Sequence, residues 1–268
     1  MKVIVSHDVD HLYPSDHWRD LYYPKLWVRS LLELLRGQIR FKVFWQRLIS
    51  VFDQRINRLP EICAFDRENG VPSTFFFGMA HALGMAYNQD KAREWIRYVQ
   101  EEGYDAGVHG CNYLTLDGIR KEHDDFAALT GSDAFGIRNH YVRYDENTFK
   151  KMEQAGYLFD TTEFNKERPT YKAPYRIGEM WEFPLAIMDG YVLHHDLKQA
   201  QQTVSTFIQQ TIETGGKYIT ILFHDCFYDE KSYPTEKAFY EWLIHYLQSM
   251  NLEFVSYKDA IKELEYDR

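Results

Sequence analysis

The chain has 268 residues, of which 45% are hydrophobic and 26% are charged, so it can bury a large core and is too apolar to be disordered. Its formal net charge of −9 argues against a general nucleic-acid-binding protein, which needs a basic surface for phosphate contacts. The three cysteines, an odd number without a close pair, indicate neither a disulfide framework nor a zinc knuckle.

The first residues predict a short buried strand, Val3 to Val5, which leads into Ser6-His7-Asp8-Val9-Asp10-His11. Because the chain begins as a strand, we recognise no signal peptide, and without an apolar run of about 18 residues we expect a cytoplasmic protein. Asp8 and Asp10 are two positions apart in an extended chain and point to the same face. Two neighbouring carboxylates repel unless a proton or a cation lies between them. A metal site is therefore one interpretation, and a solvated acidic loop is the other.

Residues 13–60 change to a pattern of long helices, with apolar residues at helical spacing on both sides of Gly37. Between Lys25 and Arg58 this helical insertion is rich in lysine and arginine, and its only acidic residues are Glu33 and Asp53. Its net charge is therefore positive, whereas that of the whole chain is negative. Amphipathic, basic and aromatic helices can lie on an anionic membrane surface. One interpretation is therefore that the insertion lies on the inner face of the membrane. The alternative is an insertion that packs on its own domain or on a second subunit.

Beyond residue 60, strands and helices alternate to the end of the chain. Predicted strands cover residues 73–77, 105–110, 135–138, 157–160, 181–185, 218–223 and 253–255, and predicted helices cover 91–102, 119–129, 146–155, 199–213, 236–250 and a short terminal segment. This alternation predicts a parallel sheet with helical crossovers. Since no glycine-rich nucleotide fingerprint is present, we predict an α/β barrel of about seven or eight β/α units, in a single domain of residues 1–268 that includes the insertion.

Polar residues close the predicted strands: Asp8 and Asp10, His109, Arg138, Asp160 and His224. In a parallel barrel the carboxyl ends of the strands meet at one mouth, where active sites are built. Taken singly, each residue has an ordinary explanation as a salt bridge or a buried histidine. Their shared placement favours a functional site.

These residue types suit metal-assisted hydrolysis. Asp10 and His109 would hold a divalent ion, and Asp8 would act as general base. Arg138 would keep Asp8 ionised. His224 would donate a proton to the leaving group, with Asp160 stabilising its charged form.

The order of the motifs resembles the polysaccharide deacetylase family, also called the NodB-homology domain, over nearly the whole chain outside the insertion. The matching stretches are Ser6-His7-Asp8-Val9-Asp10, residues 73–77, Gly107-Val108-His109, Gly136-Ile137-Arg138 with Tyr141, Asp160, and residues 221–225 with His224. The resemblance implies a distorted (β/α) barrel and metal-dependent removal of acetyl groups from sugars. It also implies that Asp8 is the base, Asp10 and His109 are metal ligands, and His224 is the catalytic histidine.

Two positions depart from the family pattern. Tyr113 stands four residues after His109, where the family has its second metal histidine, and tyrosine is a poor ligand for zinc at neutral pH. His140 stands where the third motif usually has proline, which resembles a variant subgroup. We predict that His140, with His11 as the alternative, supplies the missing ligand of a divalent metal, zinc being the expected ion. Tyr113, Tyr141 and Asp225 are the predicted substrate-binding residues.

Three functions remain open from the sequence. The first is a deacetylase acting on an N- or O-acetylated sugar of a surface polysaccharide or its precursor, such as a nucleotide- or lipid-linked sugar. The second is a metal-free, inactive protein on the same fold that binds a glycan or assembles a complex. The third is hydrolysis of another non-peptide C–N bond, because a fold does not fix the substrate.

Overall fold

A computed structural model describes residues 1–193 and 196–266. Its strands form one sheet in the order β6-β7-β5-β4-β3-β2-β1-β9-β8, with β10 paired to β1. Neighbouring strands run parallel, except for the antiparallel pair β6 and β7. The strands are β1 (Lys2–Val9), β2 (Thr74–Gly78), β3 (Asp105–Gly110), β4 (Gly136–Asn139), β5 (Phe159–Asp160), β6 (Tyr175–Ile177), β7 (Met180–Glu182), β8 (Ile187–Met188), β9 (Tyr218–Leu222) and β10 (Glu253–Phe254).

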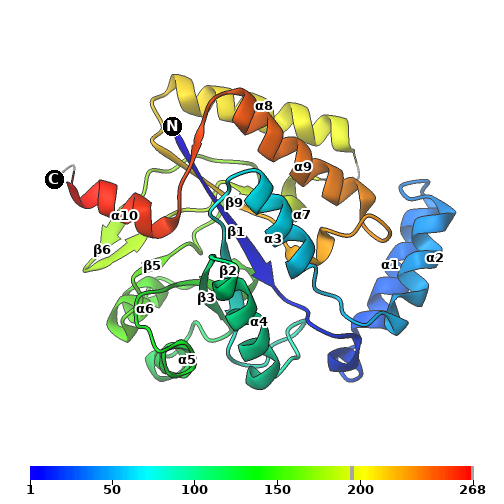
Figure 1. Cartoon of the computed structure of the whole chain (residues 1–268), viewed down its shortest axis with the longest axis horizontal. Helices are drawn as coiled ribbons and strands as arrows, with labels where there is room; N and C mark the ends of the chain where they lie inside the picture. The colour runs from blue at the N-terminus through cyan, green and yellow to red at the C-terminus, as the bar shows by residue number, and fades with distance from the viewer. Residues whose placement is uncertain (194–195, 267–268) are drawn as a thin grey trace.

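Helices surround the sheet, and α1 and α2 stand together at one side of the molecule (Figure 1). The helices are α1 (Tyr22–Leu35), α2 (Phe41–Ile49), α3 (Leu59–Glu68), α4 (Gln89–Glu101), α5 (Leu116–Thr130), α6 (Thr148–Ala155), α7 (Asp189–Val192), α8 (Leu197–Glu213), α9 (Pro234–Ser249) and α10 (Tyr257–Tyr266). The N-terminus and α10 lie on the side opposite α1 and α2 (Figure 1).

The predicted fold class, a distorted α/β barrel with a helical insertion after the first strand, is confirmed. The sheet is curled, and within the described residues it ends at two edge strands, β6 and β8. The short elements β6, β8 and α7 were not predicted from the sequence, because two to four residues carry no measurable periodicity. The ten-residue helix α3 was also not predicted.

Strand β1 lies in the middle of the sheet and separates two apolar regions. Val3, Val5 and Val9 belong to the large core between the sheet and its covering helices. Ile4 points the other way, into a cluster with Phe76 and Tyr257 inside the curled sheet. Burying one such aliphatic side chain contributes about 1.5–3 kcal/mol, so both faces of β1 hold it in register.

The insertion folds as predicted into two helices separated at Gly37, whose φ of +70° places it in the left-handed region that glycine adopts at low cost. The two helices form a hairpin, which we call the α1–α2 hairpin (residues 22–49). It leaves the sheet just after β1 and therefore stands beside the carboxyl end of the strands (Figure 1).

Candidate metal centre and catalytic cleft

The alternation of β1 sorts its polar side chains onto two faces. His7 points outward, where its Nδ1 contacts the Phe223 carbonyl oxygen at 2.9 Å and its Nε2 contacts Asp66 Oδ2 at 3.0 Å. Ser6 and Asp8 point inward, and both contact the guanidinium of Arg138. His7 therefore fixes β1 against the helical layer, while the even-numbered residues build the candidate site.

Arg138 is fully buried at the end of β4 and binds Asp8 directly. Its Nη1 donates to Asp8 Oδ1 at 2.8 Å, and its Nη2 donates to Ser6 Oγ at 2.7 Å. Burial lowers the pKa of Arg138, but the charge and hydrogen bond of Asp8, together with the nearby Tyr257 and Asp160, raise it above its ordinary value. The ion pair occupies one carboxylate oxygen of Asp8, and the other, Oδ2, lies 3.7 Å from His109 Nε2.

Asp10, His109 and His140 bring three potential ligand atoms together. Asp10 Oδ1 lies 3.1 Å from His109 Nε2 and 3.3 Å from His140 Nδ1, and the two nitrogens are 3.0 Å apart. The far nitrogen of each ring contacts a backbone carbonyl: His109 Nδ1 that of Arg138, and His140 Nε2 that of Leu83, both at 2.9 Å.

These contacts decide which ring nitrogens carry hydrogen. A carbonyl oxygen can only accept, so the far nitrogens must donate, and a neutral ring then turns a lone pair toward Asp10. Two lone pairs and a carboxylate oxygen therefore converge, and Asp10 Oδ1 is buried without a hydrogen-bond donor. Such a cluster needs a proton or a cation at its centre.

The pKa values of the cluster reflect the same attraction. Burial raises the pKa of Asp10, but the close contacts with His109 and His140, which attract the carboxylate once a ring is protonated, outweigh it and hold the pKa well below its usual range. Burial lowers the pKa of His140, yet contact with Asp10 raises it above its ordinary value. Without a metal, a proton on His140 would compensate the carboxylate.

The donor set fits a divalent transition metal. Ligand atoms about 2.0–2.1 Å from a tetrahedral zinc ion lie roughly 3.3 Å from one another, close to the separations seen here. Two imidazoles and one carboxylate also match the catalytic type of zinc site, in which one position stays open. His140 belongs to this cluster, as predicted. His11 does not, because its Nδ1 contacts His17 Nε2 at 3.2 Å.

His224 lies across the cleft from the cluster, with its Nε2 3.8 Å from Asp10 Oδ2. The sequence-based expectation that Asp160 stabilises His224 is wrong, because the carboxylate at His224 Nδ1 is that of Asp189, at 2.9 Å. Asp189 also accepts the backbone N–H of His224 at 2.6 Å. Burial lowers the pKa of His224, but the charge and hydrogen bond of Asp189 outweigh it and raise the pKa to about 10.

Asp160 is instead buried beside Glu182 on the neighbouring strand β7. Its Oδ1 accepts the Thr162 hydroxyl at 2.6 Å. Burial raises the pKa of Asp160, and burial together with the Asp160 charge raises that of Glu182 well above its ordinary value. Asp160 therefore stabilises the turn after β5 and makes no contact with His224.

A cleft of about 300 Å³ opens in front of these groups. The predicted substrate-binding residue Tyr141 lines it, is 47% exposed and donates its hydroxyl to the Leu83 carbonyl at 3.1 Å. The insertion contributes part of the wall. The lining residues are Asp10, His11, Asp20, Tyr22, Lys25, Leu26, Arg29, Leu83, Gly84, Tyr141, His224, Cys226, Phe227 and Tyr233.

The other two predicted substrate-binding residues do not line this cleft. Asp225 is fully buried and accepts the backbone N–H of Arg58 at 3.0 Å, so it anchors the start of α3. Burial raises its pKa to about 8. Tyr113 lines a separate groove with Arg143 and Lys166, so it cannot replace the histidine that the family pattern places at its position.

Sequence reasoning missed Asp189, Lys25 and Arg29. Asp189 directly follows the apolar run 185–188 and so closes a strand, as the other site residues do. It was missed because the strand of that region was predicted at Trp181 to Leu185. Lys25 and Arg29 belong to the insertion, and nothing in their spacing indicates that α1 turns toward the mouth of the sheet.

Comparison with known proteins supports the fold. No protein-family model and no curated protein sequence matches the chain. A crystal structure from Mycobacterium smegmatis, assigned as a polysaccharide deacetylase, matches with a TM-score of 0.60 and 16% identity, over 98% of this chain and 88% of that one. The chain has the fold of the polysaccharide deacetylases.

Two other matches are more distant. A polysaccharide deacetylase from Bacillus cereus matches with a TM-score of 0.49 and 13% identity, over 96% of this chain and 91% of that one. A pseudoenzyme of carbohydrate esterase family 4 from Bacillus anthracis matches with a TM-score of 0.48 and 11% identity, over 96% of this chain and 64% of that one. Within the polysaccharide deacetylase fold, the cluster of Asp10, His109 and His140 lies at the carboxyl ends of β1, β3 and β4.

Proposed function

We propose that the protein is a metal-dependent hydrolase that removes acetyl groups from an N- or O-acetylated sugar of a surface polysaccharide or its precursor. The supporting observation is the convergence of Asp10, His109 and His140, with Asp8 bound to Arg138 on one side and His224 bound to Asp189 on the other. In this proposal residues 1–268 act as one domain, and the expected cytoplasmic location stays a prediction.

Asp10, His109 and His140 would hold the metal, with His140 in place of the second histidine of the family pattern. A divalent cation bound there supplies Lewis-acid polarisation of the acetyl carbonyl. Asp8 Oδ2 faces the cluster and is left free by the Arg138 contact to Oδ1, so it accepts the proton of the attacking water. The Arg138 guanidinium pairs with the Asp8 carboxylate and fixes its orientation.

His224 acts as the general acid. Its Nδ1 hydrogen is committed to Asp189, so its Nε2 hydrogen is the one directed into the cleft, toward the leaving nitrogen or oxygen. Tyr141, exposed at the rim, offers a flat ring for a sugar face.

Release of acetate from a panel of N- and O-acetylated sugars tests the proposal, with metal content measured on the same samples. Asp8→Asn should abolish release and keep the metal, whereas Asp10→Asn should lose both. A chelator should stop the reaction, and added zinc should restore it. If pure protein binds no divalent ion and releases no acetate from any sugar, the metal-free glycan-binding alternative holds. Retained metal with release of ammonia or an amine from other amides would favour a different C–N hydrolase.

A further inference from the structure

The α1–α2 hairpin has an inverted amphipathic pattern. The buried residues of α1 are Tyr23, Ser30 and Glu33. Four of its apolar residues are exposed, Val28, Leu31, Leu32 and Leu35, whereas Leu26 and Leu34 are half-buried. The exposed apolar side chains on and next to the hairpin are Trp18, Leu21, Val28, Leu31, Leu32, Leu35, Phe41, Trp45 and Phe52. At about 100° per residue, the exposed apolar residues of α1 form one continuous stripe.

Polar contacts attach this hairpin to the rest of the molecule. Glu33 accepts from Arg47 Nη1 at 2.6 Å and from Arg29 Nε at 2.7 Å. Arg47 Nε in turn donates to the Ser232 carbonyl at 2.7 Å, and its guanidinium lies 4.4 Å from the centre of the Tyr233 ring. The inner side of the hairpin is thus held by charges, and its apolar side is left outward.

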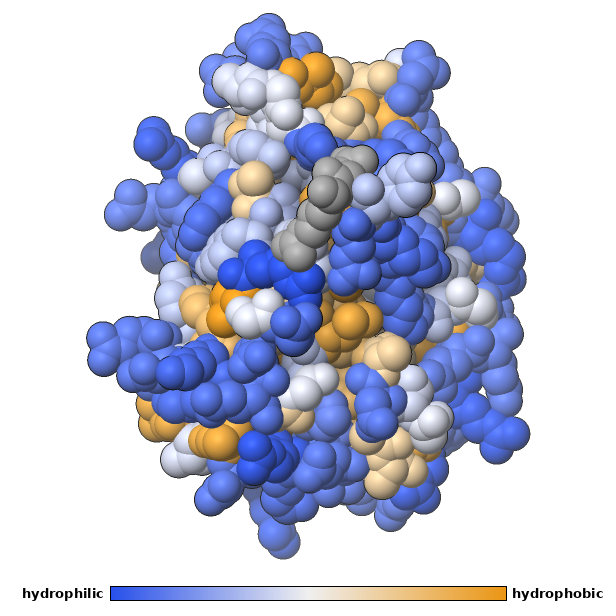
Figure 2. Space-filling model, turned by 90° about the vertical axis from the view of Figure 1, so that its left-hand side faces the viewer, coloured by the Kyte–Doolittle hydropathy of each residue, from blue (hydrophilic) through white to orange (hydrophobic). Residues whose placement is uncertain are grey.

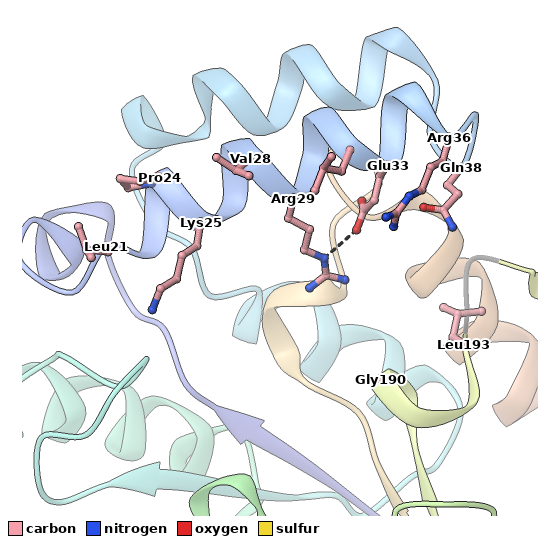
Figure 3. A pocket seen from close by; sticks show the side chains of 11 residues that line it. Leu21, Pro24, Lys25, Val28, Arg29, Glu33, Arg36, Gln38, Gly190 and Leu193 are labelled. Carbon is pink, nitrogen blue, oxygen red and sulfur yellow. Dashed lines mark hydrogen bonds and ion pairs between the residues drawn. The ribbon is translucent and has the colours of Figure 1, made fainter.

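Basic residues border the apolar stripe. Lys25, Arg29 and Arg36 project along one edge of α1 (Figure 3), and Arg40 and Lys42 follow at the turn into α2. Within the parts of the chain that the structure describes, Lys25, Arg36, Arg40 and Lys42 enter no ion pair. This concentration of uncompensated positive charge occurs in a chain of net charge −9.

The hairpin also borders the catalytic cleft. Lys25 and Arg29 line both that cleft and a second groove of about 790 Å³, which runs between α1 and Gly190 at α7 (Figure 3). By contrast, the side that carries α10 and β6 is covered mostly by hydrophilic residues (Figure 2). The exposed apolar surface is therefore placed beside the mouth of the site.

We propose that the α1–α2 hairpin docks the protein on an anionic lipid bilayer, with the apolar stripe in the interface and the basic edge against the lipid headgroups. Exposed Trp18 and Trp45 suit the headgroup level, and a basic face attracts anionic lipid. This goes beyond the proposed hydrolase activity. It implies that the substrate is presented at the membrane surface, next to the groove that continues into the cleft.

A second copy of the chain fits this surface less well. Two-fold pairing would place the same patch on both partners, so Lys25, Arg36 and Lys42 of one copy would face a surface with the same positive sign. None of the helices within the described ranges is long and apolar enough to cross a bilayer, so the contact would be peripheral.

Co-sedimentation of the full chain with phosphatidylcholine vesicles, with or without about 30% phosphatidylglycerol, tests the proposal. We expect binding to the anionic vesicles only, weakening as salt rises. Arg36→Glu combined with Lys42→Glu should weaken binding at least about tenfold, since each basic residue near the surface contributes about fivefold. The control is Lys121→Glu combined with Lys150→Glu, at positions on α5 and α6 outside the hairpin. It changes the net charge by the same amount as the hairpin variant and should leave binding intact.

The apolar stripe is tested by Leu35→Ser combined with Phe41→Ser. Both side chains are highly exposed, so the fold should tolerate the change, whereas vesicle binding should fall at least about tenfold. Leu114→Ser combined with Ile212→Ser, at exposed positions outside the hairpin, is the matched control. Absence of binding, equal binding to neutral vesicles, or a dimer dissociated by the Leu35 and Phe41 changes would each overturn the proposal. None of these results depends on acetate release.

Discussion

The contact between His224 and Asp189 predicts a specific change in the pH dependence of the reaction. Burial lowers the pKa of His224, but Asp189, with smaller contributions from Asp10 and Asp8, raises it from 6.5 to about 10. A general acid must be protonated, so activity falls as pH rises through this pKa. Asp189→Asn removes the charge, lowers the pKa of His224 and should move the alkaline limb of kcat to lower pH.

The expected displacement is smaller than the full difference between the two values. The His224 side chain is 21% exposed, so solvent screens part of the Asp189 charge, and Asp10 still raises the pKa in the variant. We therefore expect the alkaline limb to move by about two pH units, which corresponds to roughly 2.7 kcal/mol. The assay is kcat for acetate release between about pH 5 and 10. Near the acidic end the variant should retain most activity, whereas above about pH 8 it should lose most of it.

A structural effect of the same substitution can be separated from the effect on proton transfer. Both carboxylate oxygens of Asp189 accept backbone N–H groups, from Gly190 and His224, and an amide can accept only one of them. Asp189→Asn should therefore lower stability by about 1–3 kcal/mol, measured by urea unfolding. If the folded variant shows an unchanged alkaline limb, or loses activity equally at every pH, the assignment of His224 as an acid raised by Asp189 is refuted.

Three further outcomes follow from the same geometry. His140→Ala should lower zinc affinity at least about tenfold, measured by elemental analysis and competition with a chelator, and unchanged affinity would remove His140 from the metal site. Tyr113→His should leave zinc affinity unchanged, because Tyr113 lines a different groove, and a clear gain would show that the loop reaches the cluster. Arg138→Met should destabilise the protein by about 3–5 kcal/mol in urea unfolding, since it leaves Asp8 buried without its cation. In an Asp8→Asn background that cost should shrink, and an equal cost would contradict the ion-pair explanation.

The sequence by itself determined the fold class and most of the polar groups of the site. Parallel strands end at one edge, so a polar residue that closes a buried strand, such as Asp8, His109 or Arg138, could be assigned to that edge without coordinates. His140 could be proposed as a ligand for the same reason, since it directly follows β4.

Pairing across the mouth was decided only by the tertiary structure. Which carboxylate contacts His224 depends on the neighbours of β9, and β9 pairs with β8, the two-residue strand that precedes Asp189. Asp160 lies in β5 on the other arm of the sheet, next to Glu182, so it cannot reach His224. A two-residue strand has no sequence period from which its position could have been predicted.

The orientation of the insertion was also settled in three dimensions. Its basic and apolar residues are evident in the sequence, but helical spacing alone does not say which side packs inward, and apolar residues usually do. Here the ion pair of Glu33 and Arg47 lies on the inner side, because a buried carboxylate needs its cation nearby, and Leu31, Leu32 and Leu35 are left exposed. Sequence thus determined the chemistry of the hairpin, and tertiary packing determined that its apolar stripe lies exposed beside the cleft that Asp10 and His224 line.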